Sequence, residues 1–107
     1  MTQPDSSLIT HHSSLSGLRI VEFAVFAAGP VVSKHLANFG AEVIRVESHL
    51  NPDGFRAHYP PFADNQPGLD RSGCFALFND GKLGVTLNLK MPEASTWPNG
   101  WWPAPTW

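Results

Sequence analysis

The sequence has little charge and a single cysteine, and it has no long hydrophobic run. Asp, Glu, Lys and Arg make up 15% of its 107 residues, against roughly 25% in an average soluble domain. The net charge is −2, and the seven Lys and Arg residues are spread singly along the chain. Because nucleic-acid-binding proteins gather Lys and Arg on one surface, this charge pattern argues against that class.

The single cysteine, Cys74, cannot form an internal disulfide or build a cysteine-based zinc site, and it fits a reducing compartment. No apolar run approaches the roughly 20 residues of a membrane-spanning helix. The first 14 residues lack the basic start and apolar centre of a secretory signal. We therefore expect a soluble, cytoplasmic protein that binds neither membrane nor nucleic acid.

Composition divides the chain into three segments. Residues 1–14 are polar and aperiodic, which is typical of a loose leader. Residues 15–93 carry the periodic apolar pattern of a folded segment, and the length leaves room for one domain at most. Residues 94–107 have no charge and hold three prolines and all four tryptophans of the chain, Trp97, Trp101, Trp102 and Trp107.

A strand, a helix and a second strand are predicted near the start of the folded segment. Residues 18–23 and 41–46 are short runs rich in branched apolar residues, typical of buried strands. Pro30 suits the first turn of a helix and Gly40 its end. Between them one apolar stripe recurs at helical spacing, at Val32, Leu36 and Phe39. A connection of this length excludes a hairpin, so we expect the two strands to be parallel.

Further elements follow a long polar stretch. Residues 47–70 are predicted to form a loop without structure of its own, with a type I turn at residues 51–54. Residues 72–79 are predicted to form a short helix with Ser72 near its cap. Residues 84–89 alternate apolar and polar and predict a third strand.

These elements predict an α/β fold with a partial Rossmann-like parallel sheet. A parallel sheet needs helices on both of its faces, and the segment has too few helices to supply them. We therefore expect the incomplete N-terminal part of a larger domain, with apolar surface left exposed.

The loop after the first strand is where open α/β sheets bind ligands. Residues 24–30 (AVFAAGP) hold one glycine, so the dinucleotide pattern G-x-G-x-x-G is absent. Glu47, at the end of the second strand, stands where such folds hold a ribose. The small residues of this loop serve either close packing of helix on strand or a nucleotide-like ligand, and the residues alone leave both open.

Other candidate groups give weaker signals. The histidines show no metal-ligand spacing, and no metal site is expected: His11, His12, His35, His49 and His58. Cys74 lies in an apolar stretch and is expected to pack as a small hydrophobic side chain. Lys82 and Arg56 each have two possible roles, as a solvated turn residue or as a phosphate contact.

Three stretches resemble the N-terminus of class III CoA-transferases. They are residues 15–48 (LSGLRIVEFAVFAAGPVVSKHLANFGAEVIRVES), 52–56 (PDGFR) and 75–94 (FALFNDGKLGVTLNLKMPEA). This family includes the carnitine- and bile-acid-type CoA-transferases and the 2-methylacyl-CoA racemases.

The resemblance implies a Rossmann-like segment that helps to hold coenzyme A, bound as the acyl-CoA substrate. It also implies an interlocked homodimer and transfer of coenzyme A between carboxylic acids by an aspartate nucleophile, through an anhydride and an aspartyl-CoA thioester. Carried over by position, the coenzyme A contacts are Phe26, Ala27, Ser48, Asn79 and Lys82. Some members have Gln in place of Ala27 and Arg in place of Ser48.

The family's catalytic aspartate matches no aspartate of this sequence, so we expect the chain alone to be inactive. The resemblance stops near Ala94, and we hypothesise that residues 94–107 arise from a frameshift or truncation. One alternative is a fragment of a racemase of the same family. Another is a non-enzymatic nucleotide-binding or interaction module that uses the tryptophan-rich tail as its contact surface.

Overall fold

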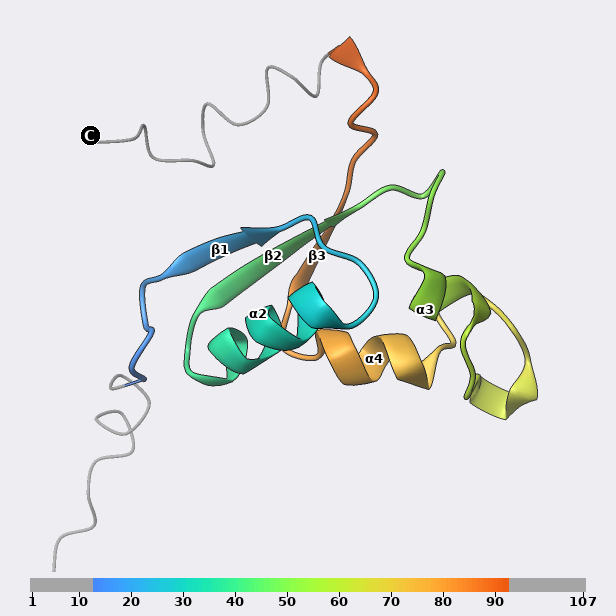
Figure 1. The fold of residues 1–107 in the computed structure, drawn as a ribbon, viewed down its shortest axis with the longest axis horizontal. Helices are drawn as coiled ribbons and strands as arrows, with labels where there is room; N and C mark the ends of the chain where they lie inside the picture. The colour runs from blue at the N-terminus through green and yellow to red at the C-terminus, as the bar shows by residue number, and fades with distance from the viewer. Residues whose placement is uncertain (1–12, 93–107) are drawn as a thin grey trace, which may run out of the picture.

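The computed structural model describes residues 13–92. Their helices and strands follow one another along the chain (Figure 1) in this order: β1 (Arg19–Glu22), α2 (Ala28–Asn38), β2 (Glu42–Glu47), α3 (Gly54–His58), a 3₁₀ helix (Ala63–Asn65), α4 (Gly73–Asn79) and β3 (Leu83–Thr86). The predicted tail 94–107 and residues 1–12 of the predicted leader lie outside the described residues, so the predictions for them stay predictions.

The three strands form one parallel sheet, as predicted. Their order in the sheet is β1-β2-β3. The third strand is shorter than the predicted range 84–89. Glu47, the last residue of β2, is the register partner of Thr86, and Leu87 N donates a final hydrogen bond of 3.0 Å to the Glu47 carbonyl. Beyond that point no strand among residues 13–92 pairs with β3, so its ladder ends.

The predicted helix begins two residues before Pro30, at Ala28, so that proline lies in the first turn, where its missing N–H costs nothing. Gly40 follows the helix with φ 103°, a conformation that favours glycine. The apolar stripe is not the buried face: Val32 and Phe39 are 58% and 60% exposed, whereas Pro30 and Ser33 are buried. The helix turns Ser33 inward because its hydroxyl donates to the buried Glu22 carboxylate at 2.6 Å.

The stretch 47–70 is not the structureless loop that its polarity predicts, because it holds α3 and the 3₁₀ helix. The predicted type I turn is also wrong. Asp53 has φ −53° and ψ 133°, which is extended backbone, and it caps α3 by accepting a hydrogen bond from Phe55 N at 2.9 Å. The predicted helix α4 is confirmed, and Ser72 caps it through Phe75 N at 3.1 Å.

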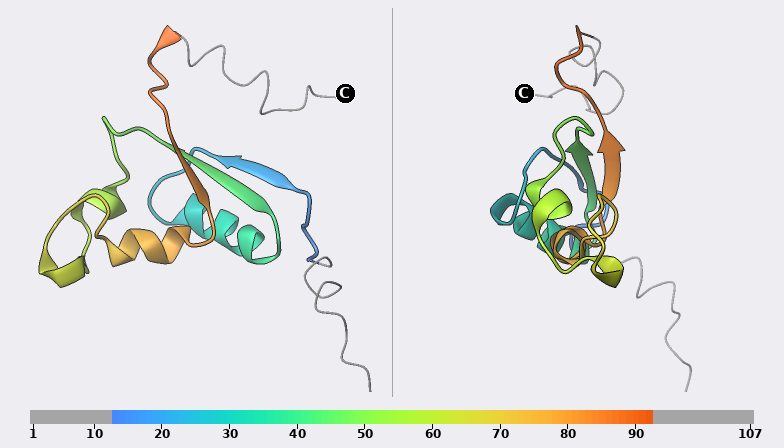
Figure 2. Two further views of the ribbon diagram at one scale, coloured as in Figure 1. Left: turned by 180° about the vertical axis from the view of Figure 1, so that it is seen from behind. Right: turned by 90° about the vertical axis from the view of Figure 1, so that its right-hand side faces the viewer.

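The described helices gather on one face of the sheet (Figure 2). Side chains alternate between the faces of a strand, and the opposite face carries an apolar row of Val21, Phe23, Ile44, Val46, Leu83 and Val85. Phe23 and Leu83 are 57% and 55% exposed, since no helix among the described residues covers this face. The expected exposure of apolar surface is therefore present. None of the described helices is long and apolar enough to cross a membrane.

Candidate functional site

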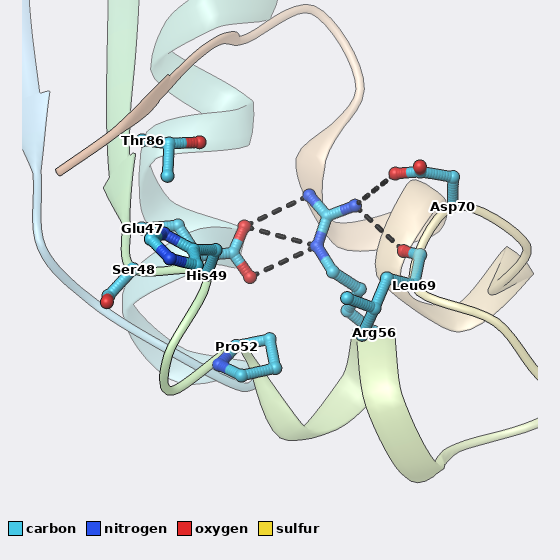
Figure 3. Close-up of a pocket in the computed structure, with 8 residues that line it drawn as sticks. All are labelled: Glu47, Ser48, His49, Pro52, Arg56, Leu69, Asp70 and Thr86. Atoms are coloured by element: carbon cyan, nitrogen blue, oxygen red, sulfur yellow. Dashed lines mark hydrogen bonds and ion pairs between the residues drawn. The ribbon is translucent and has the colours of Figure 1, made fainter. Parts of the chain in front are cut away.

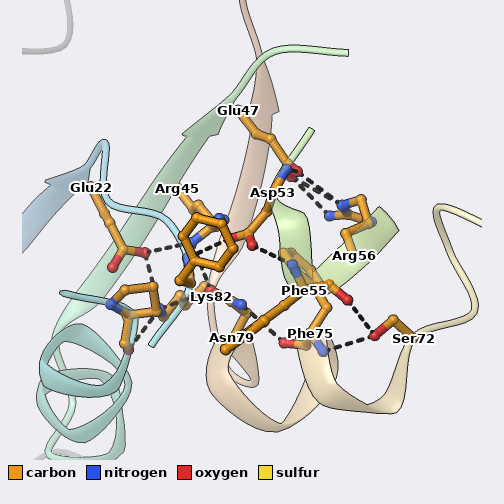
Figure 4. A network of polar contacts seen from close by, with 12 residues as sticks. Glu22, Arg45, Glu47, Asp53, Phe55, Arg56, Ser72, Phe75, Asn79 and Lys82 are labelled. Carbon is orange, nitrogen blue, oxygen red and sulfur yellow. Dashed lines mark hydrogen bonds and ion pairs between the residues drawn. The ribbon is translucent and has the colours of Figure 1, made fainter. Parts of the chain in front are cut away.

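A buried cluster of charges lies between the sheet and the helices (Figure 4). Arg45, in the middle of β2, has a side chain only 3% exposed. It forms an ion pair with Asp53, lies 3.5 Å from Glu22 Oε2, and donates to Asn79 Oδ1 at 3.0 Å. Its guanidinium also lies 5.1 Å from the centre of the Phe75 ring, a cation–π contact. A charge buried this deeply is tolerable only with such partners.

Lys82 completes the cluster from the turn before β3. Its Nζ donates to Glu22 Oε2 at 2.9 Å, to the Pro30 carbonyl at 2.9 Å and to Asn79 Oδ1 at 3.0 Å. These bonds use all three donors of the ammonium group. Burial lowers the pKa of Lys82 below its ordinary value, and the hydrogen bond and charge of Glu22 oppose that shift only in part.

The cluster is balanced in charge, because the two carboxylates of Glu22 and Asp53 face the two cations of Arg45 and Lys82. It joins β1, β2, the start of α2 and the turn before β3. These contacts stabilise the packing of these elements against one another. They also use every donor of Lys82, so none is free for a ligand.

A second ion pair borders a cleft of about 230 Å³ (Figure 3). The Arg56 guanidinium binds the Glu47 carboxylate at 3.0–3.1 Å and also donates to Asp70 Oδ1 at 3.1 Å. The same guanidinium lies 3.7 Å from the centre of the Phe75 ring. Arg56 is therefore not a solvated turn residue, because it lies in α3 with a side chain only 21% exposed. Its role as a phosphate contact stays a prediction.

The loop after β1 is held by a contact from outside it. Phe26 has φ 61°, which is uncommon for a residue other than glycine, and its N–H donates to Asp53 Oδ2 at 3.1 Å. Its ring packs edge-on against Phe55, with centroids 5.5 Å apart. A Cβ on Gly54 would lie 2.4 Å from the Phe26 ring, so this close approach requires glycine.

A larger cleft, of about 450 Å³, lies at the carboxyl ends of all three strands. It is lined by the residues that follow β1, by the end of β2 and its loop, and by the residues that follow β3: Phe23, Val25, Val46, Glu47, Ser48, Leu50, Asn51, Leu87, Asn88, Leu89 and Lys90. Open α/β sheets bind their ligands at this edge. Its walls are more apolar than polar, and the polar residues that line it are Glu47, Ser48, Asn51, Asn88 and Lys90.

The structure divides the five predicted contact residues into two groups. Ser48 lines the cleft at the carboxyl edge. Phe26 is the next residue after Val25, which also lines that cleft, and Ala27 is the N-cap of α2. Asn79 and Lys82 instead lie together in the buried cluster and border a separate cleft of about 300 Å³ on the helix side of the sheet. Their roles toward a ligand stay predictions.

Sequence reasoning missed Arg45 and Asp53 as parts of the site. Arg45 lies between the apolar residues Ile44 and Val46 near the centre of β2, and a charge at such a position indicates a buried partner. Asp53 precedes Gly54 and has the pattern of a helix cap, which the turn prediction obscured. Among the described residues no group of three or more His, Cys, Asp or Glu side chains is placed to hold a metal ion.

Comparison with known proteins identifies the family. The profile of CoA-transferase family III matches residues 15–97, and the chain belongs to this family. It is 40% identical over 80 residues to a succinate–glutarate CoA-transferase of Agrobacterium fabrum, covering 74% of this chain and 20% of that protein. It is 37% identical over 79 residues to an (R)-2-hydroxy-4-methylpentanoate CoA-transferase of Clostridioides difficile, covering 74% and 19%.

A solved structure supports the same conclusion about the fold. The crystal structure of a CAIB/BAIF family protein from Brucella suis superposes with a TM-score of 0.65 and 38% sequence identity, covering 76% of this chain and 21% of that one. The chain thus spans about a fifth of the length of the relatives it matches. The expected family and the Rossmann-like α/β fold are confirmed.

Proposed function

We propose that this chain supplies the coenzyme A-binding part of an enzyme that transfers coenzyme A between carboxylic acids. One observation carries the proposal: the cleft of about 450 Å³ opens at the carboxyl ends of the strands in a member of CoA-transferase family III. The relatives named above are CoA-transferases, which favours transfer over the racemase alternative.

We assign the ligand-facing role to Phe26, Ala27 and Ser48. Ala27 caps α2 without a side-chain hydrogen bond, so no side chain in the described part of the protein occupies the first N–H groups of that eleven-residue helix. Such groups attract the phosphates of a nucleotide. The apolar walls of the cleft suit the less polar pantetheine arm of coenzyme A.

In this proposal Asn79 and Lys82 do not contact the ligand and instead support the start of α2. Lys82 Nζ binds the Pro30 carbonyl in the first turn of α2, and Asn79 in turn binds Lys82 and Arg45. The two residues thereby fix the start of the helix that faces the ligand.

The described aspartates do not offer a nucleophile. Asp53 is buried against Arg45, and the others form ion pairs on the surface: Asp64 with Arg71, Asp70 with Arg56, and Asp80 with Lys34. We therefore propose that the aspartate that would carry the anhydride and the aspartyl-CoA thioester is not among them.

In an assay with an acyl-CoA donor and a free acid, the 107-residue chain alone should show no transfer, and measurable turnover would contradict this assignment.

Substitution of Ser48 by arginine tests the binding site directly. Ser48→Arg places a cation at the edge of the cleft and should tighten coenzyme A binding about fivefold, which corresponds to roughly 1 kcal/mol for an exposed ion pair. Calorimetric titration at low and high salt should show the gain shrinking with salt. Ser48→Gln, a long uncharged side chain, is the matched control. Equal affinities of the two variants would place the phosphates away from Ser48.

A further inference from the structure

The Asp53 side chain connects three segments of the site. It is 1% exposed, and its two oxygens have different partners. Oδ1 accepts the capping bond from Phe55 N at the start of α3, whereas Oδ2 accepts from Phe26 N at 3.1 Å and from the Arg45 guanidinium. Asp53 N in turn donates to Glu47 Oε2 at 2.8 Å. The loop after β1 is thus linked to the strand and loop that follow it.

Phe26 needs such support. A left-handed backbone costs an ordinary residue about 1–2 kcal/mol, so Phe26 at φ 61° keeps this conformation only where its surroundings hold it. The supports in the structure are the Asp53 carboxylate on its N–H, the Phe55 ring on its edge, and the close passage of its ring over Gly54. Two of these three supports come from the neighbouring residues Asp53 and Gly54.

We propose that Asp53 is a positioning residue of the coenzyme A site. Its carboxylate holds Phe26 in the left-handed conformation, and this fixes the direction of the loop that leads into the N-terminus of α2. The inference rests on the proposed function, because the loop matters to a ligand only if coenzyme A binds there. It adds a residue that does not itself line the carboxyl-edge cleft.

The variant Asp53→Ser separates the two roles of the carboxylate. Serine is a good N-cap, so its hydroxyl can replace Oδ1 at the start of α3. It has no second oxygen for Phe26 N, so the connection to the loop is lost. Asp70→Ser is the matched control, because it removes the same atoms and charge from a side chain that is 95% exposed.

Two readings are taken on the whole 107-residue chain. In the wild type, the Phe26 amide should exchange with solvent at least about tenfold more slowly than in a free peptide, the effect of one hydrogen bond to a charged acceptor. In Asp53→Ser this protection should disappear while the amide of the buried strand residue Val43 stays protected. The dissociation constant of Asp53→Ser for coenzyme A should rise roughly tenfold, because the same hydrogen bond to a charged acceptor is lost. Asp70→Ser should change neither the exchange rate of the Phe26 amide nor the dissociation constant.

Each outcome decides a separate question. Free-peptide exchange of Phe26 in the wild type would overturn the proposal without any variant. Loss of its protection in Asp53→Ser with an unchanged dissociation constant would overturn the positioning role. If Val43 also loses protection, the isosteric Asp53→Asn replaces serine, since its single oxygen cannot satisfy both Phe55 N and Phe26 N. A wild type that protects Phe26 but binds no coenzyme A would refute the proposed function and leave the Asp53 connection as part of the fold.

Discussion

Arg45→Met should abolish the cooperative unfolding transition of the chain or lower its free energy of unfolding by about 3–5 kcal/mol. The substitution removes the cation that pairs with Asp53 and Glu22, both of which are buried. It leaves two carboxylates with Lys82 as the one remaining cation of the cluster. Small domains have only about 5–15 kcal/mol of stability in total, so such a loss is a large part of the whole.

Urea unfolding followed by circular dichroism measures this effect. Arg71→Met is the control, because Arg71 forms a surface ion pair with Asp64, whose side chain is 89% exposed. Such pairs contribute about 0–1 kcal/mol. Similar losses in the two variants would show that burial of Arg45 does not matter to the fold.

Glu22→Gln should be nearly as damaging, with a loss of about 3 kcal/mol. It leaves Arg45 and Lys82 with one carboxylate, and it removes the group that partly opposes the lowered pKa of Lys82, so that pKa should fall further. The double variant Glu22→Gln with Lys82→Met removes one charge of each sign. Because the balance of the cluster is then restored, it should recover at least half of the loss.

The double-variant cycle is read from urea midpoints at neutral pH. Recovery requires coupling between Glu22 and Lys82, which the 2.9 Å contact between Nζ and Oε2 provides. Additive losses in the two single variants and the double variant would contradict the charge-balance account of this cluster.

Much of the fold was predictable from local pattern. The apolar runs around β1 and β2, the proline and glycine that border α2, and the Ser72 cap of α4 each depend on residues close together in the chain. α3 escaped prediction because a five-residue helix has too few residues to show a period. Its stability depends on the Asp53 cap and on contacts of Phe55 with residues distant in sequence.

The buried cluster could not be predicted in the same way. Lys82 and Glu22 are 60 residues apart in the chain, and no local signal pairs them. The α2 stripe misled for a related reason. Val32 and Phe39 have helical spacing, but they are not on the side of the helix that faces the sheet. That side carries Ser33 and the Pro30 carbonyl, which complete the polar cluster. The need of the buried charges for hydrogen-bond partners therefore sets the orientation of α2.

Mapping of coenzyme A on the chain tests the central claim most directly. Coenzyme A is titrated into the isotope-labelled 107-residue protein, and the amide shifts are followed by nuclear magnetic resonance. We expect saturable changes at Ser48 and residues 87–89, which line the cleft at the carboxyl edge of the sheet, and at Phe26 and Ala27, which follow the lining residue Val25. The segment around Arg71 should stay unchanged. Absence of saturable changes, or changes confined to the helix side around Asp70, would contradict it.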